Sequence, residues 1–412
     1  MTCCLLSALL LTSLPAVEEA APALEVFPAW ESDGEVERVM LDLSGWVSVA
    51  LGSSPDLEAA AADVEAARAS RGSARSLLLP TLSLSASAGR TWSTSVGATG
   101  DPVDLGTGSY SASLTLTQDI LNSGGSDWLS LSAQEQALDA SEEDYRAARL
   151  ALELEVLEAF YDVVEAGELE RSAERALERS ARQLERVEAL YGMGGATTLE
   201  YLQASVQESS DRLRVSQRSQ ALRTAYYELY DACGLIPRGA TMYLVDLRAV
   251  LEPLSLETLR GMDLDPGSSP GLAASRHRLR QAELSWRAQR RSYWPSLSVS
   301  GSYSWSDDEL GLDGWSDEDR WNVMLSLRWT IFDGWLRESR IGSSRAGYLR
   351  SAASLESLES SLVAGIAGLR ESLAGSIESY DLAVQSSDLA LQAYDLAVRS
   401  YELGAASLIE IL

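Results

Sequence analysis

The chain has 412 residues, of which 46% are hydrophobic and 23% are charged, so it can bury a large core and is not disordered by composition. Its formal net charge is −28 and all 33 basic residues are arginine, which argues against a nucleic acid partner. With one histidine, His277, and three cysteines, the chain has no set of residues for a zinc cluster or a Cys/His or Ser/His catalytic centre. The composition therefore points away from an enzyme and predicts no cofactor and no metal.

The N-terminus resembles a secretory signal peptide. Residues 5–14 are mostly apolar, small residues follow, and Ala21-Pro22-Ala23 fits an A-x-A cleavage site, so residues 1–23 are expected to be removed on export. A short buried helix is the alternative. No later segment reaches 18 consecutive apolar residues, so no transmembrane helix is predicted, although the alternating strands of a membrane barrel escape this test.

Proline is absent from residues 103–236 and 296–412, which permits very long helices there. Apolar residues recur at steps of four and three through 150–191 and again through 362–401, which is the spacing of a coiled-coil seam. The first predicted seam includes Leu150, Leu154, Ala173 and Val187, and the second includes Leu369 and Leu391. The pattern predicts helices on the order of 100 Å long, since each residue adds about 1.5 Å. An ordinary long bundle is the alternative. The predicted long helices span 123–191, 197–233 and 335–403.

Four segments alternate with a period of two, with apolar side chains on one face and mainly serine and threonine on the other. Each has about the length that a tilted strand needs to cross a bilayer. The predicted strands span about 80–92, 108–121, 295–305 and 321–332. Aromatic residues near the strand ends are candidates for the membrane interface: Trp92, Tyr110, Tyr303, Trp305 and Trp321.

The strands also predict how the chain assembles. Residues 93–107 and 306–320 are rich in glycine and aspartate and fit long extracellular loops. A soluble sheet packed on one face would alternate in the same way, but the hydroxyl-rich second face and the strand length favour a membrane barrel. Since barrels begin at about eight strands and lipid does not tolerate open edges, several chains would have to combine their strands.

The two halves of the chain are duplicates. Ser-Ser-Pro-Asp-Leu at 53–57 matches Ser-Ser-Pro-Gly-Leu at 268–272, and Leu-Pro-Thr-Leu-Ser at 79–83 matches Trp-Pro-Ser-Leu-Ser at 294–298. We therefore expect a first repeat over 24–234, an equatorial linker over 235–267 and a second repeat over 268–412. The helix at 197–233 has no counterpart in the second repeat, so its final helix is expected to be missing or truncated.

This ordered duplication resembles the TolC-like outer-membrane efflux protein family (outer membrane factors). The resemblance rests on the segments at 53–69 and 79–85, on their second-half copies, on Ile-Phe-Asp-Gly-Trp at 331–335 and on Tyr-Glu-Leu-Gly at 401–404 with 407–412. It implies an α+β membrane protein with a long α-helical coiled-coil barrel and four transmembrane β-strands per chain, which in a homotrimer form a 12-stranded β-barrel. It also implies a location in the outer membrane, extending into the periplasm.

The same resemblance implies function and sites. The chain would be a channel subunit that acts as the passive exit duct of a tripartite efflux or type I secretion system, with a periplasmic adaptor, an inner-membrane pump and outer-membrane lipid as partners. Glu410 and its first-repeat counterpart Glu200 are candidates for an acidic periplasmic gate, with a solvated helix-tip glutamate as the alternative for Glu410. Candidates for the helix tip and adaptor contacts are Tyr191, Gly194, Gly195, Tyr401 and Gly404. A periplasmic structural coiled-coil protein and a truncated, non-conducting relative are the alternatives.

Overall fold

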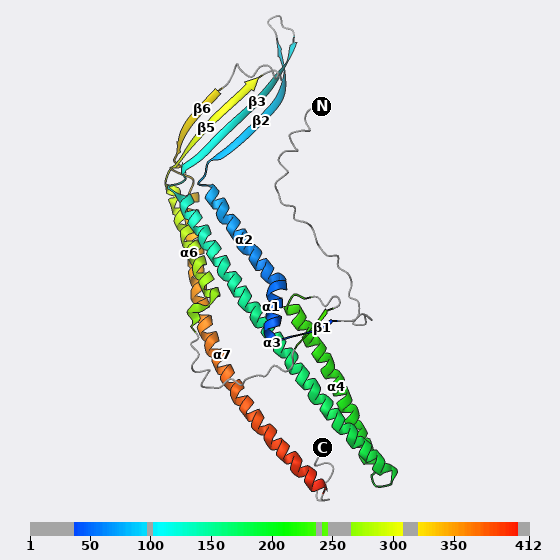
Figure 1. Cartoon of the computed structure of the whole chain (residues 1–412). Helices are drawn as coiled ribbons and strands as arrows, with labels where there is room; N and C mark the ends of the chain where they lie inside the picture. Colours follow the sequence, from blue (N-terminus) through cyan, green and yellow to red (C-terminus); the bar gives the residue numbers. More distant parts are fainter. Residues whose placement is uncertain (1–36, 97–101, 236–240, 246–264, 308–319, 403–412) are drawn as a thin grey trace.

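The computed structural model describes residues 37–96, 102–235, 241–245, 265–307 and 320–402. They form an elongated molecule in which a curved sheet stands at one end and long helices run away from it (Figure 1). The elements are, in chain order, β1 (Glu37–Leu41), α1 (Leu43–Ser53), α2 (Pro55–Ser76), β2 (Thr81–Val96), β3 (Pro102–Leu121), α3 (Ser126–Gly192), α4 (Thr198–Ala232), β4 (Thr241–Val245), η1 (Pro266–Ser268), α6 (Pro270–Arg290), η2 (Arg291–Tyr293), β5 (Ser296–Asp307), β6 (Arg320–Arg328) and α7 (Leu336–Glu402).

The main sheet is antiparallel, with strand order β2-β3-β5-β6. Its middle pair, β3 and β5, comes from the two halves of the chain, so the duplicated hairpins join side by side into one sheet. β2 and β3 are longer than predicted: Val96 lies opposite Pro102, so the prediction of a loop over 93–107 was wrong at both of its ends. β6 ends at Arg328, earlier than predicted.

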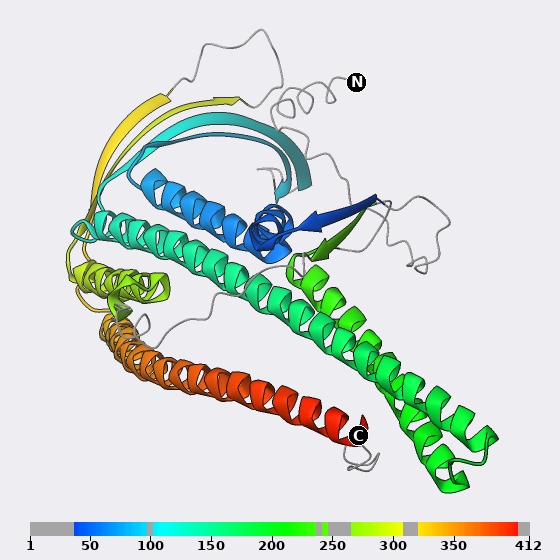
Figure 2. The same ribbon diagram turned by 60° about the horizontal axis from the view of Figure 1, so that its bottom comes forward.

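Helices run away from the sheet in both halves of the chain. α3 and α4 form a hairpin that extends farthest from the sheet, while α6 packs against α3 and against the upper part of α7 (Figure 1). In both views the lower half of α7 lies apart from the α3–α4 hairpin (Figure 2). Within the described residues, no helix is both long enough and apolar enough to cross a membrane.

The hydrophobic core lies midway along the helices, where α1, α3, α4 and β4 meet. The fully buried Trp46 of α1 packs edge-on against Tyr230 of α4, with ring centroids 5.7 Å apart. Phe160 of α3 and Leu229 of α4 are also buried in this cluster. Cys233 is buried here too, and burial together with the charge of Glu155 raises the pKa of its thiol to about 11, so it is an unreactive packing residue.

A parallel pair of short strands, β1 and β4, closes this core and was not predicted. Glu37 lies opposite Thr241 and Leu41 opposite Val245, so the segment predicted as an equatorial linker contributes a strand and a buried side chain, Val245. Residues 236–240 and 246–264 of that linker lie outside the described residues, as do the predicted signal peptide and residues 403–412.

The seam predicted for α3 is only partly the one that the chain buries. Ala173 and Val187 are buried at their predicted positions. Nearer the core, however, Leu150 and Leu154 are more than half exposed, whereas Leu152 is buried in the core cluster, which includes residues of α1 and α4. α3 therefore carries a second apolar stripe that the described part of the chain leaves uncovered.

Shortening a side chain in the core should destabilise the protein much more than shortening an exposed side chain. We expect Leu229→Ala to lower the free energy of unfolding by about 2–5 kcal/mol, because it leaves a cavity between α4 and α3. Thermal or urea unfolding followed by circular dichroism would measure this loss. The neighbouring exposed Glu228→Ala is the control and should change stability by less than about 0.5 kcal/mol; equal effects would contradict the assignment of the core.

Candidate functional site: a two-faced sheet and a helix tip

The register of the sheet joins apolar side chains into rows that run across all four strands. Because side chains alternate along a strand, residues paired across strands share a face. Two such rows read, in strand order, Leu84–Leu114–Tyr303–Trp321 and Leu82–Leu116–Gly301–Val323. Leu84 is 75% exposed and Val323 69% exposed, so none of the described helices covers this face. A large continuous apolar surface of this kind requires a partner or a lipid environment.

The opposite face of the sheet is a surface of hydroxyl groups. Two of its rows read Ser83–Thr115–Ser302–Asn322 and Ser85–Ser113–Ser304–Arg320. The hydroxyls of Ser85 and Ser113 lie 2.8 Å apart and hydrogen-bond each other, as do those of Ser87 and Ser111. This face is suited to water, whereas the other is suited to hydrocarbon.

The predicted interface aromatics gather at the end of the sheet farthest from the helices. Tyr303 lies opposite Trp321, Trp305 opposite Ala112, and Tyr110 opposite Ala88, all on the apolar face. Trp92 is on the same face, and the guanidinium of Arg90 lies 5.6 Å from its ring centroid. Aromatic rings with polar neighbours at one rim of an apolar face fit the boundary between hydrocarbon and water.

A second group of exposed aromatic residues lies where the sheet joins the helices, and this group was not predicted. Phe332 and Trp335 are in edge contact, and the indole of Trp329 donates a hydrogen bond to the Tyr293 carbonyl. The group comprises Trp128, Tyr293, Trp294, Trp329, Phe332 and Trp335. Trp329 and Phe332 fall within the predicted fourth strand, beyond the end of β6, and the other members lie outside the predicted strands; their shared signal was a position at or beyond the helix-proximal ends of the alternating segments. The apolar rows therefore lie between two aromatic belts.

Tight turns with left-handed backbone connect strands to helices at this junction. Gly124 and Gly334 have φ of 66° and 70°, in the corresponding turns of the two halves. At Gly124 a Cβ atom would come within 2.6 Å of the Trp294 side chain, so only glycine allows the two repeats to approach here. In the second turn Arg337 is buried, donates to the Thr330 carbonyl and lies over the Tyr293 ring.

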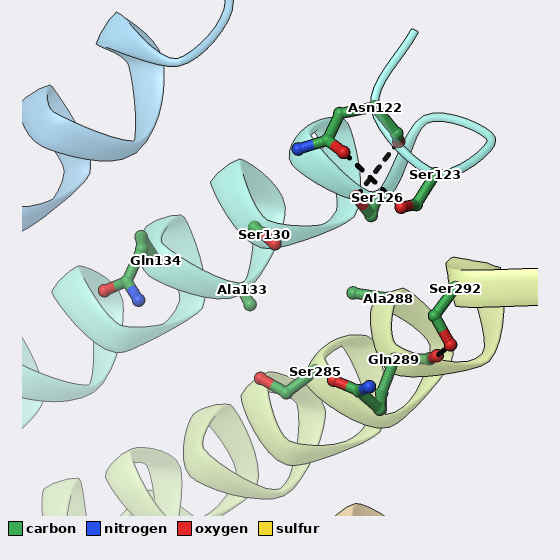
Figure 3. A pocket seen from close by; sticks show the side chains of 10 residues that line it. All are labelled: Asn122, Ser123, Ser126, Ser130, Ala133, Gln134, Ser285, Ala288, Gln289 and Ser292. Atoms are coloured by element: carbon green, nitrogen blue, oxygen red, sulfur yellow. Dashed lines mark hydrogen bonds between the residues drawn. The ribbon is translucent and has the colours of Figure 1, made fainter. Parts of the chain in front are cut away.

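A groove lies between α3 and α6, close to this junction (Figure 3). It has a volume of about 360 Å³. Its lining residues are small or uncharged: Asn122, Ser123, Ser126, Ser130, Ala133, Gln134, Ser285, Ala288, Gln289 and Ser292. None of these side chains is an acid or a base, so the groove offers hydrogen bonds but no proton transfer.

The tip of the α3–α4 hairpin contains the first-half residues predicted for gate and adaptor contacts. Gly194 has a φ of 79°, and the Gly195 amide donates to the Leu190 carbonyl at 2.8 Å, which closes the turn. The rings of Tyr191 and Tyr201 stack across the hairpin with centroids 5.5 Å apart. The turn thus brings Tyr191, Gly194 and Gly195 together in one small, rigid tip.

Glu200 has a defined local role at this tip. Its carboxylate accepts hydrogen bonds from the Thr197 amide at 2.7 Å and from the Thr197 hydroxyl at 2.9 Å, which makes it half of the capping box of α4. These bonds to the charged form lower the pKa of Glu200. In the second half, the backbone of Tyr401 is in the last turn of α7, whereas its side chain, Gly404 and Glu410 lie outside the described residues.

The capping role of Glu200 predicts a pH-dependent tip. Since the folded pKa is lowered, the stabilisation is present above the unfolded value of about 4.3 and is lost as the pH falls through the folded pKa. Glu200→Gln should therefore reduce amide hydrogen-exchange protection over residues 197–204 at pH 7, and the difference from the unmodified protein should shrink as the pH falls through the lowered folded pKa. A difference that keeps the same size from neutral to acid pH would contradict this role.

Comparison with known proteins matches this architecture. Residues 46–235 and 267–412 match the family described as "Outer membrane efflux protein". The chain is 28% identical over 355 residues to the outer membrane protein OprJ of Pseudomonas aeruginosa, covering 77% of this chain and 67% of OprJ.

Solved structures share the fold. The outer membrane channel CmeC of Campylobacter jejuni superposes with a TM-score of 0.75 at 22% identity, covering 90% of this chain and 78% of CmeC. The outer membrane protein VceC of Vibrio cholerae superposes with a TM-score of 0.74 at 20% identity, covering 90% of this chain and 88% of VceC. The resemblance expected from the ordered duplication is confirmed, and the chain belongs to the outer membrane efflux protein family.

Proposed function

We propose that copies of this chain join edge to edge into a β-barrel in the outer membrane and act as the passive exit duct of a tripartite efflux or type I secretion system. The observation that carries the proposal is the sheet β2-β3-β5-β6, with one apolar face, one hydroxyl face and two outer strands. Within the part of the chain that the structure describes, β2 and β6 each pair on one side only. Lipid does not tolerate such edges, so neighbouring copies must pair them.

We infer that the assembly is a homotrimer. Three copies supply twelve strands, an even number within the range of known barrels, whereas two copies supply only the minimum of about eight. Membership of the family favours three. The long helices would then continue the barrel as a tunnel across the periplasm, toward a periplasmic adaptor and an inner-membrane pump.

The uncovered helix stripes support association along the tunnel as well as in the barrel. Leu150 and Leu154 of α3 are more than half exposed. On α7, Leu369 and Leu391 belong to the predicted seam and are 71% and 62% exposed. Leucines at seam spacing pack into a facing helix, so these stripes suit the helices of neighbouring copies.

The helix tip is the proposed contact for the adaptor. Exposed apolar side chains surround the turn at Met193, Leu199 and Leu202, next to Tyr191 and the two glycines, and an amphipathic tip of this kind suits a helical partner. We propose Glu410, with Glu200, for an acidic gate. The capping bonds of Glu200 occupy one of its carboxylate oxygens, which leaves the other free for such a ring. No catalytic role is proposed, and the substrate of the duct follows from its pump.

The assembly is directly testable. The full chain purified from outer membranes in mild detergent should run as a trimer that heating in dodecyl sulfate converts to monomers, and it should conduct ions in planar bilayers. The trimer is expected because four strands leave two edges to be paired. Purification as a water-soluble monomer would overturn the duct and favour a periplasmic structural protein.

The two faces of β3 are expected to differ in how well they tolerate a charged side chain. Leu116→Arg places a cation among the apolar rows and should weaken the assembled barrel by about 2–4 kcal/mol, measured as loss of heat-sensitive trimer in outer membranes. The control Thr117→Arg changes the adjacent residue on the hydroxyl face and should leave trimer yield nearly unchanged. If both variants assembled equally, the apolar face would not contact lipid.

A further inference from the structure

Two arginines stand on the hydroxyl face of β6. Val323, Leu325 and Leu327 lie on the apolar face, so Arg320 and Arg328 lie on the other, opposite Ser304 and Ser296 of β5. Both arginines are exposed. Within the described part of the chain, no carboxylate forms an ion pair with Arg328, so its charge is not neutralised locally.

The remainder of this face is nearly neutral. Among the strand residues whose side chains the structure describes, Arg320 and Arg328 are the only cations on the hydroxyl face and Asp119 is the only acid. Asp119 lies opposite Ser298, two strands away from Arg328. The sheet therefore contributes a net positive charge to this face, although the whole chain carries −28.

The two arginines lie at opposite ends of the part of β6 that crosses the membrane. They are separated by eight residues, or about 26 Å along a strand that rises about 3.3 Å per residue. Arg320 adjoins Trp321 of the outer aromatic belt, and Arg328 adjoins Trp329 of the inner one. In the proposed trimeric barrel, on which this inference rests, three copies would place a ring of three arginines at each end of the lumen.

We propose that these arginines make the barrel section of the duct favour anionic solutes. Rings of arginine or lysine select anions in other pores because they lower the energy of a negative charge on the axis. Hydroxyl walls do not cancel that field, since serine and threonine carry no charge. The ligand class is small anions, such as inorganic phosphate, and carboxylate-bearing molecules; the sign of the barrel is opposite to that of the whole chain.

A cysteine probe can read the sign of the local potential directly. Ser298→Cys places a thiol on the hydroxyl face, opposite Ser326 and one row from Arg328. The native Cys233 is fully buried and so contributes little background, and Cys3 and Cys4 are replaced by serine in every variant. The trimer in proteoliposomes is treated with the anionic sulfonatoethyl or the cationic trimethylammonioethyl methanethiosulfonate, and the two modification rates are compared.

Arg328→Gln is expected to lower the ratio of the anionic to the cationic rate by about threefold or more, because three screened charges at close range are lost. Both reagents attack the same thiolate, so a change in thiol reactivity cancels from the ratio. Arg328→Lys keeps the charge and should keep the ratio. Arg90→Gln is the matched control: Arg90 lies over Trp92 on the apolar face, and its loss should leave the ratio unchanged.

The outcomes separate this inference from the proposed function. An unchanged ratio in Arg328→Gln, with Ser298→Cys reactive to both reagents, would overturn the anion preference and leave the barrel standing. A Ser298→Cys thiol that neither reagent reaches would overturn the barrel itself. If Arg328→Gln does not form heat-sensitive trimers, Arg320→Gln with the probe Ser302→Cys, opposite Asn322, tests the outer ring in the same way.

Discussion

The fold depends on the requirement that every backbone amide and carbonyl in hydrocarbon must be hydrogen-bonded. A sheet of four strands satisfies this requirement at its centre and fails at β2 and β6. Within the described residues nothing pairs these edges, because the other long elements are helices that run away from the sheet (Figure 1). In the proposed barrel, assembly is therefore a condition of stability for the sheet, and membership of the outer membrane efflux protein family is consistent with that demand.

One chain buries part of its apolar surface in its own core and leaves the rest exposed, where neighbouring copies in the proposed assembly would cover it. Trp46, Phe160 and Leu229 pack in a core formed by α1, α3, α4 and β4, which a single chain completes on its own. The apolar rows of the sheet and the stripe at Leu150 and Leu154 remain exposed. The division follows the geometry: the core lies at the middle of the molecule, where three helices and a strand meet, and the exposed surfaces lie where the elements separate.

The sequence predictions that rested on periodicity were the most accurate. The period-two segments and the four-three spacing identified the strands and the long helices, because both patterns persist over many residues. The β1–β4 pair was missed since each strand has five residues, too few for a pattern. The choice of Leu152 over Leu150 for the core could not be predicted, because two stripes of similar spacing coexist on α3 and only the position of α1 and α4 decides between them.

The candidate site was predictable in place but not in detail. The outer aromatic residues were found because they fall inside strands that the structure confirms, whereas Trp329 follows the end of β6 inside an overextended predicted strand and Trp335 lies in the turn beyond it. Glu200 was recognised as an acid at the tip, but its bonds to Thr197 depend on where α4 begins, which the sequence located only to within a residue or two. Distant contacts, such as Trp294 against Gly124, had no local signature.

In the proposed barrel, the paired hydroxyls of Ser85 with Ser113, and of Ser87 with Ser111, affect how strongly a passing solute binds to the wall. Each pair uses one of its two O–H groups within the wall and leaves the other to water, so a solute that replaces this water exchanges one hydrogen bond for another and gains little. A surface that water already satisfies shortens the residence time of any cargo. Such a lining resists fouling without discriminating between cargoes by shape.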